Sequence, residues 1–406
     1  MENVEEKILN NIDSMKNEII GFLQELVKIP SEVPPGKYRP ISKSVAAKMK
    51  ELGLNTKVKR NNVIGEVGND NGPILIFNAH LDTVLTSDGW TKDPYGGEII
   101  ENKIYGRGAA DDKSCVVAEL FATKALLNAG IDINGKLILT AVVNEEISGV
   151  GGTEYIVNEE IINGDACLIG DVSCDYPIAF QGGTLQVRFT IKGIRRNAQA
   201  YPDLPPPNRN KYSGINAIAK MVPIINFLME LQEELKEIET KYPLPPDLPL
   251  KISSINMTVI NGGNWMNAIP DNCDLHCLIS CIPETDLENI RNRILDFVEG
   301  MKKEDPDLDI TVRIPVFVEP HITDINTNFA KIVKRAFKSV FKEDREFKTF
   351  IPTTDAQLFQ QKGIETILIG PLRGENNYHA QDEFVYIEDV INVTKIFAIT
   401  ALNYLK

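Results

Sequence analysis

The feature that most constrains this chain is a set of short apolar runs that each stop at imidazole or carboxylate side chains. Runs of this length and composition are typical of buried strands in an α/β sheet. Charged groups at the ends of such strands need a partner or a metal ion. In an open α/β sheet this edge is where ligands bind. The runs cover residues 74–77, 137–143 and 166–170, and they are followed by His80 and Asp82, by Glu145 and Glu146, and by Asp171.

His80 and Asp82 stand two residues apart, so an extended chain directs both side chains to the same side. The Asp82 carboxylate is then able to hold one imidazole nitrogen and fix the tautomer while the other nitrogen binds a metal. Taken alone, the pattern is weak and favours a structural histidine. Two further stretches favour the metal interpretation: a glycine-containing loop at 105–113 that leads into a predicted helix, and a loop at 377–383 that carries His379.

Length and charge exclude several classes of protein. With 406 residues, the chain is expected to form two domains, and its 43% hydrophobic content supports large cores. The formal net charge of −14 argues against nucleic acid or an anionic membrane as a partner. No early segment resembles a signal peptide and no apolar run approaches the ~18 residues of a membrane span, so we expect a cytoplasmic protein.

Six cysteines in so long a chain do not indicate a disulfide framework. Cys273, Cys277 and Cys281 invite a metal interpretation, but on a strand they would lie on one face roughly 13 Å from first to last. They cannot share one ion. We expect structural thiols, with a zinc site or regulatory oxidation as the alternatives.

The order of predicted elements indicates an α/β domain interrupted by a second domain. Strands and helices alternate through about residue 178, which predicts a mainly parallel sheet covered by helices on both faces. Residues 179–316 instead follow an α+β order and form the expected inserted domain, after which residues 317–406 return to the first. The main predicted helices cover 8–26, 41–52, 114–127, 215–240, 285–301, 325–341 and 387–405.

The motifs AHLDTV, YGRGAADDK, NEE and YHAQDE, together with the aspartate after ACLIG, give the chain a resemblance to the dinuclear metallohydrolases of the M20 peptidase family. This family includes acetylornithine deacetylase, succinyl-diaminopimelate desuccinylase, aminoacylase and glutamate carboxypeptidase. The resemblance covers nearly the whole chain. It implies a zinc-peptidase-like catalytic domain with an inserted lid domain.

The resemblance also implies a ligand set for two metal ions. One ion would be held by His80 and Asp171, the other by Glu146 and His379, with Asp111 bridging them. Imidazole and carboxylate ligands of this kind suit Zn²⁺, with Co²⁺ or Mn²⁺ as alternatives. Glu145 matches the family's general base, which takes a proton from the attacking water and passes it to the departing amine. Asp112 is interpreted as a helix-start residue rather than a ligand.

Substrate contacts follow from the resemblance less directly. Thr354 lies in a stretch that resembles a pocket lining, and Asn267 lies in a segment that resembles a lid loop reaching the substrate. Arg373 is a candidate contact for an anionic substrate group. His276 and His321 have no counterpart and are expected to be ordinary histidines.

Two departures from the family pattern bear on the substrate. The lid histidine that stabilises the oxyanion is absent, and Asn197 or Arg196 falls nearest its position. The arginine that grips the substrate carboxylate in many relatives is replaced by Ser280. Loss of such a bidentate clamp should weaken selection for a free amino-acid carboxylate.

These observations predict an amide-bond hydrolase acting on an N-acyl amino acid, in the manner of a deacetylase or desuccinylase. A dipeptidase or carboxypeptidase of the same family is the first alternative. A catalytically inactive homologue that binds metal and serves as a binding protein is the second. Relatives also imply a homodimer formed through the lid domain.

Overall fold

The computed structural model describes residues 4–200, 211–246 and 251–406. The proline-rich stretch at 202–208, which falls within the range predicted for the second domain, lies outside the described residues. The chain forms two compact units. The first comprises Met1–Phe180, Ile322–Lys348 and Thr354–Lys406, and the second comprises Gln181–His321 and Thr349–Thr353. The sequence had placed residues 317–321 and 349–353 in the first domain.

The first unit contains a mixed sheet whose strand order is β1-β2-β6-β3-β7-β15-β8-β13. Its centre is parallel: β3 pairs in parallel with β6 and β7, and β15 pairs in parallel with β7. The pairs β1–β2, β2–β6 and β8–β15 are antiparallel. The strands are β1 (Asn55–Lys59), β2 (Asn62–Gly68), β3 (Ile74–His80), β6 (Lys136–Val142), β7 (Ala166–Gly170), β8 (Ile178–Gln181), β13 (His321–Ile322) and β15 (Glu365–Ile369), and β14 (Lys348–Phe350) pairs with β8.

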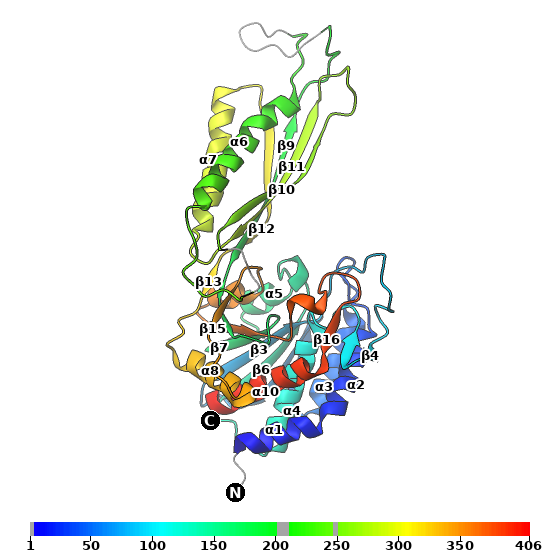
Figure 1. Ribbon diagram of the computed structural model, residues 1–406, viewed down its shortest axis with the longest axis vertical. Coiled ribbons are helices and arrows are strands. Elements are labelled where there is room, and N and C mark those ends of the chain that lie inside the picture. The colour runs from blue at the N-terminus through cyan, green and yellow to red at the C-terminus, as the bar shows by residue number, and fades with distance from the viewer. Residues whose placement is uncertain (1–3, 201–210, 247–250) are drawn as a thin grey trace. The chain divides into compact units, whose positions relative to one another are not determined.

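Helices pack on this sheet and on one another (Figure 1). Helix α4 packs on β3 and is covered by α10, while α3 packs on β1 and β2 and α9 packs on β15. Nearly every residue of α4 from its start to Leu126 is buried, because it lies between the sheet and α10. The helices are α1 (Val4–Ser14), α2 (Lys16–Val27), α3 (Arg39–Glu51), α4 (Lys113–Asn128), α5 (Thr153–Asn158), α8 (Asn328–Phe341), α9 (Ala356–Gln360) and α10 (Ile387–Tyr404).

A small antiparallel sheet, of order β16-β5-β4, lies in the same unit. It joins β4 (Glu98–Ile100) and β5 (Lys103–Tyr105) to β16 (Phe384–Tyr386), with Phe384 opposite Tyr105. This pairing brings the loop after β5, which leads to Asp111, beside the segment that carries His379. Two functional stretches distant in sequence are thereby held together.

The second unit is a four-stranded antiparallel sheet, of order β10-β11-β9-β12, with α6 and α7 packed on it (Figure 1). Alternate residues of β11 are buried, including Cys273, Cys277 and Cys281. These thiols belong to the hydrophobic core, and all six cysteines of the chain are buried and free. The elements are β9 (Gly183–Lys192), α6 (Ala217–Leu235), β10 (Ser254–Gly262), β11 (Asn272–Cys281), α7 (Leu287–Glu304) and β12 (Asp309–Val318).

Several predicted elements differ from those observed. The single helix expected over 8–26 is two helices, because Met15, between the end of α1 and the start of α2, leaves the helical conformation (φ −89°, ψ 3°). The helix expected over 215–240 ends at Leu235. Strand β1 and the short helices α5 and α9 were not anticipated from the sequence. Within the described residues, no helix has the length and apolarity needed to cross a membrane.

Candidate metal centre

The side chains of the candidate centre gather where the central parallel strands end. His80 is the last residue of β3 and pairs with Val142, the last residue of β6. Beyond β6 a 3-10 helix, η1 (Glu145–Ile147), presents the two glutamates, and Asp171 directly follows β7. Because β3 lies between β6 and β7, their carboxyl ends bring these residues to one place. The predicted grouping of His80, Glu145, Glu146 and Asp171 at one sheet edge therefore corresponds to the observed arrangement.

The imidazole of His80 is held in a single tautomer. Its Nδ1 donates to the main-chain carbonyl of Asp82 at 2.9 Å, since a carbonyl oxygen can only accept. The Asp82 carboxylate, which the sequence suggested for this role, lies farther away, with Oδ1 3.7 Å from Nδ1. The main chain thus replaces the carboxylate as the group that orients the ring, leaving Nε2 as the free nitrogen.

The Asp82 carboxylate instead orients the two glutamates. Its Oδ1 accepts the main-chain N–H of Glu145 and its Oδ2 accepts that of Glu146, both at 3.2 Å. Asp82 is fully buried, and this burial raises the pKa of its carboxyl to about 7. Asp82 is therefore a positioning residue for the Glu145-Glu146 turn.

Asp111 lies between two histidines. Its Oδ1 is 3.0 Å from Nε2 of His80, and its Oδ2 is 3.1 Å from Nε2 of His379. The same nitrogen of His379 lies 3.0 Å from Oε2 of Glu146. One carboxylate that presents a separate oxygen to each histidine has the arrangement expected of a bridging ligand.

Two sets of residues could each hold a metal ion, because within each set the possible ligand atoms all lie within 4.8 Å of one another. His80, Glu145 and Asp171 form one set, and His80, Asp111 and Glu146 form the other. Glu145 is the expected base, yet it belongs to the first set, and its Oε2 lies 3.9 Å from Nε2 of His80. By geometry alone, Glu145 therefore also qualifies as a metal ligand.

The residues present fit a pair of cations. Nε2 of His80 and Oδ1 of Asp111 are buried, and despite their 3.0 Å separation neither makes a hydrogen bond within the described residues. Buried polar atoms without partners are costly unless a ligand satisfies them. An imidazole nitrogen and carboxylate oxygens are the donor atoms that zinc and similar divalent ions take.

The pKa shifts show how much negative charge is concentrated here. Burial, followed by the neighbouring Asp171 carboxylate, raises the pKa of Glu145 well above its ordinary value. Burial would also raise the pKa of Asp111, but the nearby imidazoles of His379 and His80 together outweigh burial and lower it. Hydrogen bonds to Asp111 and Glu146 raise the pKa of His379 to about 10. Positive charge among these carboxylates is strongly favoured, as a metal centre requires.

Two residues beside the ligands have roles that the sequence did not reveal. Asp112 stands at the start of α4 as expected, but its carboxylate caps no helix N–H and accepts the main-chain N–H of His80 at 3.0 Å. The Tyr38 hydroxyl donates to Oδ1 of Asn144 at 2.5 Å. Asn144 has a left-handed backbone (φ 66°) and directly precedes Glu145. The only sequence signal for Tyr38 was its place in the proline-containing loop 31–40.

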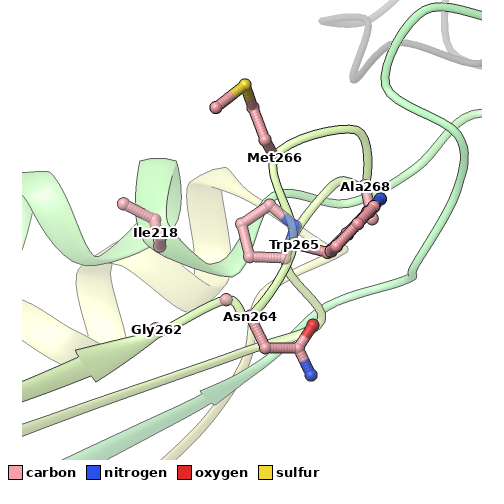
Figure 2. Close-up of a pocket in the computed structure, with 8 residues that line it drawn as sticks. Ile218, Gly262, Asn264, Trp265, Met266 and Ala268 are labelled. Atoms are coloured by element: carbon pink, nitrogen blue, oxygen red, sulfur yellow. The ribbon is translucent and has the colours of Figure 1, made fainter.

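The expected substrate contacts fall in both units. In the second unit, Asn197 and Asn267 are neighbours: Asn197 pairs with Ala268 in a β-bridge, and the Asn267 carbonyl accepts the Ala198 N–H. Both side chains are exposed. Asn267 follows Trp265 and Met266, which together with Ile218 of α6 line a shallow pocket at the tip of the β10–β11 hairpin (Figure 2).

In the first unit, Thr354 is buried, and its hydroxyl accepts the Ala356 N–H. The Arg373 guanidinium binds both carboxylate oxygens of Asp389, at 2.6 and 2.9 Å, and reaches Asp175 at 3.0 Å. Arg373 is therefore already paired with acidic neighbours, unlike a cation that is free to take an anionic substrate. His276 and His321 lie in strands β11 and β13.

The profile of peptidase family M20/M25/M40 matches residues 76–403, which include every candidate metal ligand. The chain belongs to this family. Members of the family are hydrolases, and this chain is accordingly an enzyme that acts on amide bonds.

Individual relatives differ in substrate. The chain is 26% identical to the N-formyl-4-amino-5-aminomethyl-2-methylpyrimidine deformylase of Halalkalibacterium halodurans, over 96% of this chain and 95% of that protein. It is 25% identical to the succinyl-diaminopimelate desuccinylase of Hydrogenovibrio crunogenus, over 96% and 99%. Its fold resembles that of the dipeptidase Dug1p from Saccharomyces cerevisiae, with a TM-score of 0.76, 16% identity and 98% of each chain covered.

Proposed function

We propose that this M20 enzyme removes the acyl group from an N-acyl amino acid, with Glu145 as general base and two divalent cations as cofactors. The observation that carries the proposal is the position of Asp111, whose two carboxylate oxygens each face Nε2 of a different histidine. In the proposed assignment His80 and Asp171 would hold one cation, Glu146 and His379 would hold the other, and Asp111 would be shared by both. Zn²⁺ is the proposed metal, with Co²⁺ or Mn²⁺ as alternatives.

When bound, the cations supply Lewis-acid activation of the water and of the amide carbonyl. The carboxylate of Glu145 accepts a proton from the attacking water and delivers it to the departing amine nitrogen. Asp82 keeps the Glu145 carboxylate in place by accepting two main-chain N–H groups of η1. The Asp82 carbonyl holds His80 with Nε2 directed at the centre.

Asn197, Asn267 and Thr354 remain the proposed substrate contacts. The absence of an arginine at Ser280 favours a substrate without a strictly required free carboxylate. For this reason we include N-formyl amines among the candidate substrates, alongside N-acetyl and N-succinyl amino acids. Dipeptides represent the peptidase alternative. Six buried cysteines without disulfides fit a reducing compartment, and we propose a cytoplasmic location.

The proposed assembly is a homodimer formed through the second unit. Its edge strand β10 is mostly exposed, and Met257, Val259 and Ile260 on it are 40%, 37% and 57% exposed. Helix α6, which packs against β10, exposes Ile218, Val222 and Met229. An exposed apolar edge of this kind is typical of a protein interface.

The decisive experiment compares wild-type protein with Glu145→Gln on a panel of N-acetyl, N-succinyl and N-formyl substrates and dipeptides. Loss of a general base should reduce kcat by roughly 10²–10⁴-fold while the protein still binds two metal ions. Glu159→Gln, which changes an exposed glutamate, is the matched control. Unchanged turnover in Glu145→Gln would refute the assignment of the base, and a metal-loaded wild-type protein that cleaves nothing would favour the binding-protein alternative.

A further inference from the structure

A buried ion pair connects the two loops that carry Asp111 and His379. Arg107 and Glu383 are both fully buried, and Nη1 of Arg107 donates to Oε2 of Glu383 at 2.5 Å. The small sheet brings the two residues together: Phe384 pairs with Tyr105, and the Gly106 N–H donates to the Glu383 carbonyl. The pair therefore lies where two distant segments of the chain converge.

Each partner also holds the main chain next to a metal ligand. The second carboxylate oxygen of Glu383 accepts the N–H of Ala110 at 3.0 Å and that of Asp111 at 3.2 Å. Nη2 of Arg107 donates to the carbonyl of Ala380, the residue after His379, at 3.1 Å. The guanidinium thus fixes the His379 loop, the carboxylate fixes the Asp111 loop, and their ion pair fixes one loop against the other.

Stability alone does not account for this arrangement. Removing two charges from water is costly, and apolar residues of similar volume often serve a core as well or better. What apolar residues cannot supply is a set of directed hydrogen bonds to main-chain groups on both loops. Ligands of a metal centre depend on such supporting contacts for their position.

We propose that Arg107 and Glu383 form a positioning pair that sets the separation of Asp111 and His379 and thereby determines the affinity of the second metal site. The inference rests on the proposed two-metal function. It predicts an asymmetry between the sites. The second site takes two of its ligands, Asp111 and His379, from the clamped loops. The first site shares only Asp111 and takes His80 and Asp171 from the ends of β3 and β7.

The test is a titration of metal-free protein with Zn²⁺ in the presence of a chromophoric chelator, which gives the affinity of each step. Wild-type protein should bind two ions. Glu383→Gln, which keeps the size of the side chain and removes its charge, should bind the first ion within about threefold of wild type and the second 10–100-fold more weakly, the range typical of lost supporting contacts. The control is Glu66→Gln, which removes a carboxylate on β2 that pairs with Lys57 of β1. This variant should bind both ions as wild type does.

Arg107→Lys provides an independent variant, because it retains a positive charge but lacks the second nitrogen that reaches Ala380. Arg107→Lys should also bind the second ion selectively more weakly. If Glu383→Gln does not fold, Arg107→Lys alone tests the inference. Two unchanged affinities in a folded variant, or an equal loss at both sites, would overturn the inference while leaving the two-metal function intact. Wild-type protein that binds fewer than two ions would instead refute the two-metal function itself, and the inference with it.

Discussion

Glu119 is a carboxylate buried in the middle of α4. The residue is fully buried, and within the described residues neither carboxylate oxygen makes a hydrogen bond. Burial, with a smaller contribution from the charge of Asp112, raises the pKa of Glu119 well above its ordinary value of 4.5. The folded protein therefore keeps a proton on this residue at pH values where the unfolded chain has lost it.

Such a shift makes stability depend on pH in a defined direction. Because the pKa in the folded state is the higher one, the stabilisation is complete below about pH 4.5 and is lost as pH rises toward the folded-state pKa. Glu119→Gln removes the titration, so the free energy of unfolding should fall less between pH 5 and pH 8 than in wild type. Glu119→Leu also removes the unpaired polar group and should add about 1–3 kcal/mol at pH 8.

Urea unfolding of the three metal-loaded proteins at both pH values measures these differences. Titrating groups that do not interact with Glu119 contribute equally to each protein, so the comparison cancels their contributions. If wild type and Glu119→Gln lose the same stability over this interval, Glu119 is ionised in the folded state and the interpretation of its burial is wrong.

Which residues surround a metal centre was easier to predict than how they are held. His80, Glu145 and Asp171 follow apolar runs, so the end of each predicted strand located them. Arg107 and Glu383 are 276 positions apart, and each appears in the sequence as an ordinary charged loop residue. Likewise, the main-chain carbonyl that orients His80 has no sequence signature, because every residue carries one. Supporting contacts of these kinds depend on tertiary structure.

The segment before α3 supports the turn that carries Glu145. Thr83, just beyond β3, exchanges hydrogen bonds with this segment: its N–H donates to the Ser31 carbonyl, and its carbonyl accepts the Val33 N–H. At the end of the segment the Tyr38 hydroxyl reaches Asn144. A left-handed conformation at a residue other than glycine needs support from its surroundings. Tyr38 provides that support for Asn144 and so for the neighbouring Glu145.

Tyr38→Phe should therefore impair catalysis without removing the metals. Loss of one hydrogen bond worth about 1.4 kcal/mol in positioning corresponds to a roughly tenfold lower kcat. KM and the Zn²⁺ content should stay within about twofold of wild type, because Tyr38 supports no ligand directly. Tyr212→Phe, at an exposed position of the second unit, is the matched control. Steady-state kinetics with metal analysis checks the prediction, which a parallel loss of metal and activity would contradict.

Long elements were predicted well and short ones poorly, for a physical reason. The helix of the first unit expected over 114–127 is observed as Lys113–Asn128, because its apolar residues continue for several turns. Helix α9 has five residues, too few to show a helical period. Strand β1 (Asn55–Lys59) is largely exposed and carries polar residues, so only its pairing with β2 identifies it.

At the scale of the whole molecule, the exposed surface of the second unit bears on assembly. The apolar residues of β10 continue onto α6 through Ile218 and Val222, and Trp265 and Met266 extend them at the hairpin tip, where they are 67% and 95% exposed (Figure 2). A second copy of the chain suits such a surface, because an edge strand satisfies its free main-chain groups by pairing with its symmetry mate. The other edge strand, β12, carries none of the largely exposed apolar side chains.

The double substitution Met229→Lys and Ile260→Lys should convert a dimer into a monomer. Each lysine would place a charge in the apolar interface, and both copies would carry the change, so repulsion is doubled by symmetry. Sedimentation velocity at micromolar concentrations measures the outcome. Val58→Lys, on the exposed strand β1 of the first unit, is the matched control and should remain dimeric. A monomeric wild-type protein would refute the proposed dimer, whereas a dimer that survives both lysines would place its interface elsewhere on the molecule.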